Sequence, residues 1–374
     1  MTKRLFLTLL LLTTTLLGSM AQSQSRSFRQ VARQMPTEWY ASAEALAAAD
    51  SVVKYQFPSG GWAKNHNWHL KAEGNKLQER QEVWKAINSP EGIGSTIDNN
   101  ATTQEMMLLA KVYGATGKKK YRESFVRGFD YLIAAQYDNG GWPQFYPSRP
   151  PTSDGKPYYS DHITFNDNAM LNVMLVLRDI RDNKVPYDKL KLSDKQRQQA
   201  KTAFDKGVEC ILNTQIRKDG KLTVWCQQHD EVTLLPAHAR KYELPSFTGT
   251  NETPALLDLL MDLPNPDERI VAAVSGAVEW LKAHALKDMA LESFTNKEGK
   301  RDRRLVHRFG APLIWARFYD LETEEPYVCD RDGVKQPALE YIGYERRNGY
   351  SWYSSNPQQV IKRYEKWMKT LKKE

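Results

Sequence analysis

The sequence contains few cysteines and lacks the motifs of several common enzyme classes. Among its 374 residues there are only three cysteines, Cys210, Cys226 and Cys329. In an oxidising compartment, three cysteines form at most one disulfide and leave a free thiol. Cys210 lies in a helical pattern and is predicted to be a small core residue, and we assign none of the three to catalysis. We find no P-loop, dinucleotide-binding fingerprint, zinc-ligand spacing or nucleophilic Ser or Cys elbow, so these chemistries have no motif in the chain.

The one marked apolar run is too short to span a bilayer. It extends from Leu5 to Leu17, follows two basic residues and precedes the small residues Gly18 to Ala21. This order is typical of a secretory signal peptide. No cysteine follows the run, so a lipoprotein anchor is not expected. We predict a signal peptide over residues 1–21, one mature domain over 22–374, no membrane anchor, and a secreted or periplasmic location.

Positive charges outnumber negative ones. The formal net charge is +8, and it falls by two, to +6, when the basic residues of the predicted signal peptide are removed. An exported protein is not expected to bind nucleic acid, whereas a basic surface attracts other polyanions. The alternative, that lysine and arginine only keep the surface soluble, stays open. We expect this solubilising role for the run from Lys362 to Lys373, which forms the polar face of a final amphipathic helix.

A short motif occurs three times at a nearly constant spacing. Each copy begins with a glutamine and ends with a tryptophan, over Gln56–Trp62, Gln136–Trp142 and Gln215–Trp225, and the glutamines stand 80 and 79 residues apart. Each copy closes a stretch with helical periodicity, and its glycines predict a turn that ends the helix. We expect Trp62 and Trp142 to pack beneath their own loops, and stacking against a bound ligand is the less favoured alternative.

A second element repeats out of phase with the first. Segments rich in Asn and carboxylates open apolar helical runs at Thr96–Ala101, Thr164–Ala169 and Gly249–Pro254. Each offers side chains that can cap a helix N-terminus. Two helices in each of three repeats predict a ring of paired helices rather than a βαβ fold. In such a ring, equivalent helix ends lie at the same rim, so we expect the three helix starts to converge at one mouth.

Long stretches between the helices lack helical periodicity. Loops of this length in a compact domain are usually functional. The stretches are residues 57–95, 137–164, 216–248 and 287–356.

Five motifs, taken in order, resemble the polysaccharide lyase family ten pectate lyases. Gly-Gly-Trp alone is weakly specific, because other toroids of paired helices, including terpenoid cyclases, use similar turns. The ordered set is specific and extends over about residues 57–356. The motifs are Gly60–Asn65, Thr96–Asn99, Gly140–Gln144, Phe165–Ala169 and Ala239–Glu243.

This resemblance implies a fold and an activity. The fold would be all-α, an (α/α)3 toroid of paired helices with long functional loops and a few short β segments. The activity would be endo-acting β-elimination on polygalacturonate, the acidic backbone of pectin, with a calcium ion between enzyme and substrate. We expect the protein to act as a monomer on this acidic polysaccharide, with no nucleic acid partner.

The resemblance also assigns roles to individual residues. Asp98 would bind the metal, with Asn99 and Asp167 nearby. Arg240 would be the Brønsted base. The substrate-binding residues would be Arg303, Arg317 and Lys241, of which the two arginines would bind uronate carboxylates.

The chemistry of β-elimination suits these residue types. The reaction removes the proton at C5, next to the uronate carboxylate, and expels the C4 glycosidic oxygen. A hard cation on the carboxylate stabilises the enolate-like transition state, and calcium prefers oxygen ligands such as those of Asp98 and Asp167. The alternative, that Asp98 and Asn166 only cap helices, stays open, and one carboxylate can serve both purposes.

Arg240 is an unusual base because the ordinary pKa of arginine lies above about 12. Burial and neighbouring cations such as Lys241 lower such a pKa. From the residues alone, His238 or Lys241 would be the preferred base. Arg303 lies in a run of basic residues that exposure to solvent by itself would explain. Arg317 is flanked by apolar residues, which indicates that its side chain has a fixed position.

Two other functions fit the same residues. An inverting glycoside hydrolase would use Asp98 and Asp167 as its acid and base. A non-catalytic protein that captures pectin fragments would use the same calcium and arginines. The basic loops and Arg240 favour the lyase.

Overall fold

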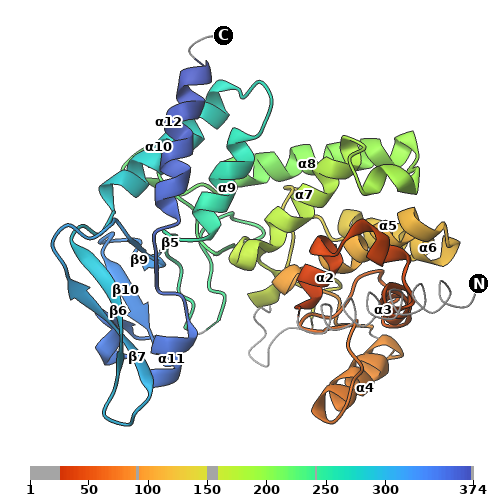
Figure 1. Ribbon diagram of the computed structural model, residues 1–374. Coiled ribbons are helices and arrows are strands. Elements are labelled where there is room, and N and C mark those ends of the chain that lie inside the picture. Colours follow the sequence, from red (N-terminus) through yellow and green to blue (C-terminus); the bar gives the residue numbers. More distant parts are fainter. Residues whose placement is uncertain (1–25, 90–91, 150–158, 241, 372–374) are drawn as a thin grey trace, which may run out of the picture. The chain divides into compact units, whose positions relative to one another are not determined.

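The computed structural model describes residues 26–89, 92–149, 159–240 and 242–371, which form two compact units (Figure 1). The first unit contains the chain up to Gln136, Phe145–Arg149 and Asn172–Phe204, and the second contains Tyr137–Gln144, Pro150–Leu171 and the chain from Asp205 onward. The predicted signal peptide and Lys241 lie outside the described residues. No helix within the described ranges is both long enough and apolar enough to cross a membrane.

Helices dominate the first unit. Helix α5 packs against α2, α3 and α6. Its buried residues include Met106, Leu109 and Val112, and the buried residues of α6 include Phe125 and Phe129. This core has the 3.6-residue periodicity that the sequence predicts. The helices that lie wholly or partly in this unit are α2 (Phe28–Gln34), η1 (Thr37–Ala41), α3 (Ala43–Lys54), α4 (Asn75–Ile87), η2 (Asp98–Asn100), α5 (Thr103–Thr116), α6 (Lys119–Ala134), α7 (Ala169–Arg181), η5 (Tyr187–Leu190) and α8 (Asp194–Thr214).

Helix α4 corrects one prediction, because it lies within residues 57–95, which we expected to lack helices. None of its residues is buried. A helix that contributes no side chain to a core carries no apolar stripe, so periodicity cannot reveal it.

Strands are numerous in the second unit, and the all-α prediction is therefore wrong. In the described part of the chain, twelve strands form five sheets, one with the order β11-β10-β9-β5 and four with two strands each. The strands are β1 (Ile163–Thr164), β2 (Arg217–Lys218), β3 (Lys221–Leu222), β4 (Gln228–His229), β5 (Phe247–Thr248), β6 (Met289–Thr295), β7 (Arg301–His307), β8 (Trp315–Ala316), β9 (Phe318–Tyr319), β10 (Pro326–Cys329), β11 (Lys335–Gln336) and β12 (Tyr353–Ser354). Most are too short to show a period of two in the sequence.

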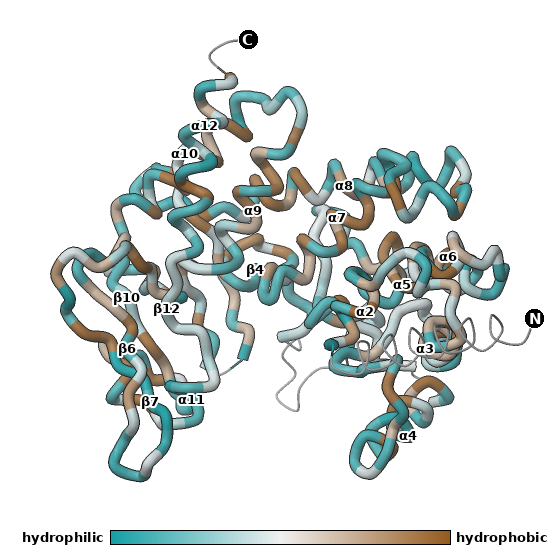
Figure 2. Tube along the Cα trace, in the orientation of Figure 1, coloured by the Kyte–Doolittle hydropathy of each residue, from teal (hydrophilic) through white to brown (hydrophobic). Residues whose placement is uncertain are grey.

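The longest strands form the β6–β7 hairpin, where Ser293 lies opposite Arg303. Figure 2 shows that the tip of this hairpin is hydrophilic. Helix α11 (Tyr344–Gly349) contacts β7. The hairpin was not predicted because charged residues occupy most of β7, so hydropathy does not alternate clearly along it.

Three helices of the second unit pack together. They are α9 (Glu252–Met261), α10 (Glu268–Ala283) and α12 (Pro357–Leu371), and they lie side by side in Figure 1. Helix α12 is the amphipathic C-terminal helix that the sequence predicts. The short helices η3 (Tyr159–Asp161), η4 (Asn166–Asn168) and η6 (Leu339–Tyr341) complete the unit.

The three repeat glutamines make equivalent hydrogen bonds. Each donates its side-chain Nε2 to a backbone carbonyl of a helix that lies between 58 and 68 residues further along the chain. The acceptors are Ser124 for Gln56 at 2.9 Å, Ala203 for Gln136 at 2.8 Å and Ala273 for Gln215 at 2.9 Å. The repeat seen in the sequence is thus a structural repeat, in which one side-chain amide is hydrogen-bonded to a helix that is distant in the sequence.

The glycines and tryptophans of the motif are structural. Gly60 and Gly140 have φ values of 102° and 90°, and a Cβ on them would overlap the backbone of α6 and of α8, respectively. Trp62, Trp142 and Trp225 are fully buried, so the prediction that they pack beneath their loops is confirmed for Trp62 and Trp142. These residues support the loops and do not offer a stacking surface.

The three cysteines are free and buried. Burial raises the pKa of the Cys210 thiol to about 12. This agrees with the prediction that Cys210 is a core residue.

Candidate functional site

In the first unit, Asp98 and Asn99 lie on a tight turn before α5. Asn99 and Asn100 have φ values of 51° and 65°, in the left-handed region that Asn tolerates better than most residues. Asp98 is 4% exposed, and its Oδ1 accepts the Asn99 amide at 2.9 Å. The N-cap of α5 is Thr102, without a side-chain capping bond. The alternative that Asp98 caps this helix is therefore wrong.

Two of the five motifs meet at this turn. Lys64 places its Nζ 2.5 Å from Asp98 Oδ2, and Asn99 Nδ2 donates to Asn65 Oδ1 at 3.0 Å. The turn thus presents carboxylate and amide oxygens, but the carboxylate already has a cationic partner. A metal ion at Asp98 has to compete with Lys64 or displace it.

The second unit contains a matching turn. Asp167 and Asn168 have φ values of 52° and 59°, and the side chain of Asp167 is exposed. Asn166 is 5% exposed and donates its Nδ2 to Asp167 Oδ2 at 3.2 Å. The same backbone geometry therefore places one carboxylate toward solvent and one amide toward the interior.

Asn166 belongs to a buried polar network with Gln227, Glu252 and Arg317. Gln227 Nε2 donates to Asn166 Oδ1 at 2.9 Å and to Glu252 Oε1 at 3.1 Å. Arg317 Nη2 donates to the same two oxygens, at 3.3 and 3.1 Å. All four residues are at most 5% exposed. Within the second unit, this network joins two of the predicted helix starts, since Asn166 precedes α7 and Glu252 begins α9.

Sequence reasoning missed Gln227 and Glu252 as parts of the site. Glu252 could have been identified from the sequence, because it lies in the third helix-start segment. Gln227 carried no signal, because it lies directly before the two-residue strand β4 and belongs to none of the motifs. Arg317 was expected to be fixed, and its side chain is only 7% exposed.

Arg317 is held as a cation by its surroundings. Burial by itself lowers the pKa of Arg317, but the charges of Glu252, Tyr350, Asp167 and Glu243 outweigh burial and raise that pKa. The guanidinium also stacks 4.4 Å above the centre of the Tyr350 ring. A fixed, permanently charged guanidinium is suited to binding a carboxylate.

Arg240 pairs with Glu243, three residues later. Its Nε and Nη2 donate to the two carboxylate oxygens at 2.9 and 2.5 Å. The Arg240 side chain is 44% exposed, whereas that of Glu243 is 2% exposed. The hydrogen bonds that Arg240 donates to Glu243 raise the pKa of Arg240, although partial burial opposes the change. This direction is the reverse of the lowering that favours proton abstraction by arginine.

Stacked arginine and tyrosine side chains connect Arg240 with Arg317. Arg240 lies 5.1 Å from the Tyr242 ring centre, and Arg346 lies 4.9 Å from the same ring. Arg346 also lies 3.9 Å from the ring of Tyr350, on which Arg317 stacks. We call these five residues the arginine–tyrosine cluster. Cation–π contacts of this kind orient guanidinium groups while preserving their charge. The structure therefore brings together two of the predicted arginines.

Arg303 lies outside this cluster, on β7. The neighbouring Asp302 is 3% exposed and accepts two hydrogen bonds from Arg347 of α11, at 2.6 and 2.7 Å. These bonds hold the pKa of Asp302 well below its usual range. Arg303 points to the other side of the strand, half-buried, and has no ion-pair partner within the described ranges. Asp302 thus anchors the hairpin and leaves Arg303 accessible.

Another group of possible metal ligands occurs in the second unit, formed by His162, Asp230 and Glu231. His162 Nδ1 lies 2.7 Å from Glu231 Oε2, so a hydrogen bond between the two side chains explains this contact. Histidine is not a ligand that calcium favours. The oxygen donors of Asp98 and Asn99 in the first unit, and of Asp167 in the second, are of the kind that calcium prefers.

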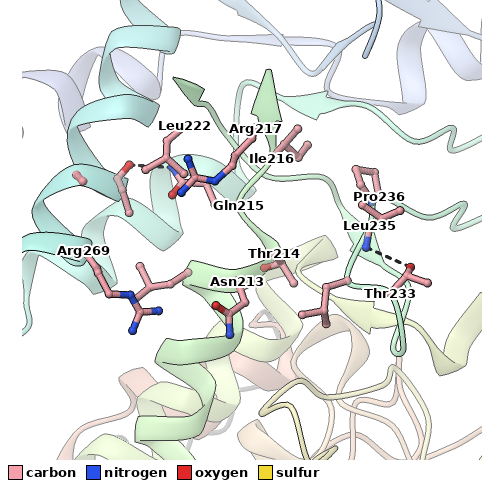
Figure 3. A pocket seen from close by; sticks show the side chains of 14 residues that line it. Asn213, Thr214, Gln215, Ile216, Arg217, Leu222, Thr233, Leu235, Pro236 and Arg269 are labelled. Atoms are coloured by element: carbon pink, nitrogen blue, oxygen red, sulfur yellow. Dashed lines mark hydrogen bonds between the residues drawn. The ribbon is translucent and has the colours of Figure 1, made fainter. Parts of the chain in front are cut away.

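Figure 3 shows a cleft of about 520 Å³ that belongs to the second unit alone. Its lining includes Gln215, Ile216, Leu235 and Arg269, and it contains no carboxylate, histidine or cysteine and none of the predicted site residues. The cleft is therefore not the site that the sequence predicts.

Comparisons with known proteins found a matching family model and related solved structures. The family model described as pectic acid lyase matches residues 56–361. A solved structure of the family 10 polysaccharide lyase from Cellvibrio cellulosa is 33% identical, covers 91% of this chain and 94% of its own, and has a TM-score of 0.72. A mutant of that enzyme in complex with trigalacturonic acid is also 33% identical, with 88% and 95% coverage and a TM-score of 0.70. Among curated proteins, no match was found.

These matches extend over almost all of the described residues and include the five motifs from which the site was built. Both the family model and the solved structures concern lyases of acidic polysaccharides. The resemblance noted from the sequence is therefore confirmed, and the protein is a lyase that belongs to the pectic acid lyase family.

Proposed function

We propose that this lyase is secreted and cleaves polygalacturonate by calcium-assisted β-elimination, with Arg240 as the proton acceptor. The arginine–tyrosine cluster is the observation that carries the proposal. It holds Arg240 and Arg317 close to Tyr242 and Tyr350 and beside buried carboxylates. A family relative has been solved with trigalacturonic acid, a fragment of this polymer.

Substrate binding falls to the arginines. Arg317 is fixed by Glu252 and by the Tyr350 ring, so its guanidinium can bind a uronate carboxylate without reordering. Arg303 stands on an anchored hairpin and is free of ion pairs among the described residues. Each would recognise a negative charge that recurs on every sugar of the polymer.

The oxygen donors that we propose for calcium are those of Asp98, Asn99 and Asp167. Asp98 and Asn99 offer them in the first unit, and Asp167 offers an exposed carboxylate in the second. When bound, calcium neutralises the uronate carboxylate and so makes the C5 proton more acidic. The protein's own task is to hold the uronate, orient C5 and accept its proton.

The base requires an explanation because Glu243 raises the pKa of Arg240. A guanidinium accepts a proton only after it has released one. The neutral guanidine therefore forms at alkaline pH, and we expect the rate to rise as the pH rises. His238 is the rival base, since burial, with the charges of His162 and Lys335, lowers the pKa of its imidazole. A histidine base would make the enzyme active already at neutral pH.

One assay tests the proposal. Purified protein is incubated with polygalacturonate, with and without a calcium chelator, and ultraviolet absorbance records unsaturated uronide ends. We expect absorbance that depends on calcium and increases toward alkaline pH. Reducing ends without the chromophore would instead establish hydrolysis by Asp98 and Asp167, and binding without turnover would establish a capture protein.

Export is tested separately. The proposal depends on the apolar run of residues 5–17 and the small residues after it. Protein recovered from outside the cytoplasm should have an N-terminus near Gln22. An intact Met1 on the exported protein would contradict signal-peptide cleavage.

A further inference from the structure

Glu243 holds one edge of the Arg240 guanidinium and leaves one nitrogen outside that pair. Its two oxygens accept from Nε and Nη2 of Arg240. Within the described ranges, Nη1 makes no hydrogen bond with the protein. The carboxylate is buried and the guanidinium is half-exposed. The pair therefore directs a single nitrogen, Nη1, away from the carboxylate.

The Glu243 carboxylate is itself on a rigid support. The Glu243 amide donates to the Arg240 carbonyl at 2.8 Å, and its own carbonyl accepts the Ala239 amide at 3.1 Å. The flanking Tyr242 and Leu244 pack against the hydrophobic core around β9 and β10. A residue fixed on both sides can hold a catalytic group within the narrow tolerance that proton transfer requires.

We propose that Glu243 is a positioning residue for Arg240. It holds the guanidinium so that Nη1 is the nitrogen that takes the C5 proton, and its negative charge sets the pH at which Arg240 can accept that proton. The inference rests on the proposed function. In the step, Nη1 of Arg240 first loses one proton to water. The C5–H bond then breaks, and the proton joins Nη1. The electron pair forms the C4–C5 double bond, the bond from C4 to the glycosidic oxygen breaks, and that oxygen takes a proton from solvent.

The charges around the pair fix the sign of the pH effect. Arg240 faces Glu243 and Tyr242 from its own turn and Tyr159 from η3, and Glu243 also faces Arg317 and Tyr350. A carboxylate beside the guanidinium favours the cation. The neutral guanidine of Arg240 therefore forms only at a pH above this raised pKa. Removal of the Glu243 charge allows it to form at lower pH.

The test compares Glu243→Gln and Glu243→Asp with the wild type on polygalacturonate, at saturating calcium, from neutral to strongly alkaline pH. Glu243→Gln keeps the shape and loses the charge. We expect the rising limb of its pH–rate profile to move to lower pH, and its maximal kcat to fall about 10–100-fold because the guanidinium edge is no longer held in place. KM should change by no more than a few-fold, because Arg317 and Arg303 still bind the uronates.

Glu243→Asp keeps the charge and withdraws it by one methylene. The rising limb of its pH–rate profile should stay near that of the wild type while kcat falls. Glu209→Gln is the matched control, because Glu209 also pairs with an arginine through both oxygens, at 3.2 and 2.9 Å to Arg269, on the surface of α8 and α10. It should alter neither the limb nor kcat.

An unmoved limb with normal kcat in Glu243→Gln would overturn the inference. So would normal kcat in Glu243→Asp, the variant that decides the matter if Glu243→Gln does not fold. A loss explained by a lower melting temperature alone, with the limb unchanged, would reduce Glu243 to a structural role. A wild type that forms no unsaturated ends would defeat the proposed function and this inference together. A wild-type lyase with unaffected Glu243 variants would defeat this inference alone.

Discussion

Replacement of Arg317 by methionine separates the structural role of this residue from its role in substrate binding. The change removes one partner of a buried ion pair, in which the Glu252 side chain is 0% exposed and accepts bonds from Arg317 and Gln227 at 3.1 Å each. The Arg317→Met variant leaves a buried carboxylate with only the neutral amide of Gln227. Loss of one partner of a buried pair costs about 3–5 kcal/mol of folding free energy.

This magnitude predicts a measurable fall in melting temperature. At roughly 2–4 °C per kcal/mol for domains of about 150–250 residues, Arg317→Met should melt at least about 6 °C below the wild type. The double variant Arg317→Met with Glu252→Gln removes both charges, and most of the stability should return because no buried charge remains unpaired. Thermal unfolding followed by circular dichroism measures both effects.

Activity should not return with stability. If Arg317 binds a uronate carboxylate, the double variant stays impaired on polygalacturonate although it is folded. Recovery of activity together with stability would show that Arg317 only supports the fold. A single variant that loses less than about 1 kcal/mol would refute the reasoning from the buried charge.

Three other changes test the remaining assignments. Asp98→Ala should abolish calcium-dependent turnover and keep the helical circular dichroism, because its side chain does not cap α5; a melted variant would contradict this. Arg240→Lys and Arg240→Ala should both lose about 10²–10⁴-fold in kcat with KM little changed, as expected for a positioned base; near-normal kcat in Arg240→Ala with collapse in His238→Ala would transfer the role to the histidine. Arg347→Met, which releases the hairpin anchor, should raise KM and spare kcat if Arg303 binds substrate, and an unchanged KM would remove Arg303 from the site.

The sequence by itself determined the features that depend on local chemistry. The repeated glutamines, the Gly-Gly turns and the buried tryptophans could be predicted, because their motif recurs at a regular spacing. The helix starts at Asp98 and Asp167 could be predicted from their Asn and carboxylate side chains, whereas the left-handed turns there were not predicted. Their spacing and order also sufficed to indicate the family.

Only the tertiary structure decided which partners these residues have. Arg317 meets Asn166 from 151 positions away and Glu252 from 65, and no local pattern encodes such a contact. Two-residue strands depend on their neighbours for hydrogen bonds, so they gave no periodicity, and the all-α prediction failed there. Glu243 shows most clearly what the sequence cannot determine. It lies three residues from Arg240 within a recognised motif, but its effect on Arg240 depends on the burial of its carboxylate. That burial depends on what the rest of the chain packs around it.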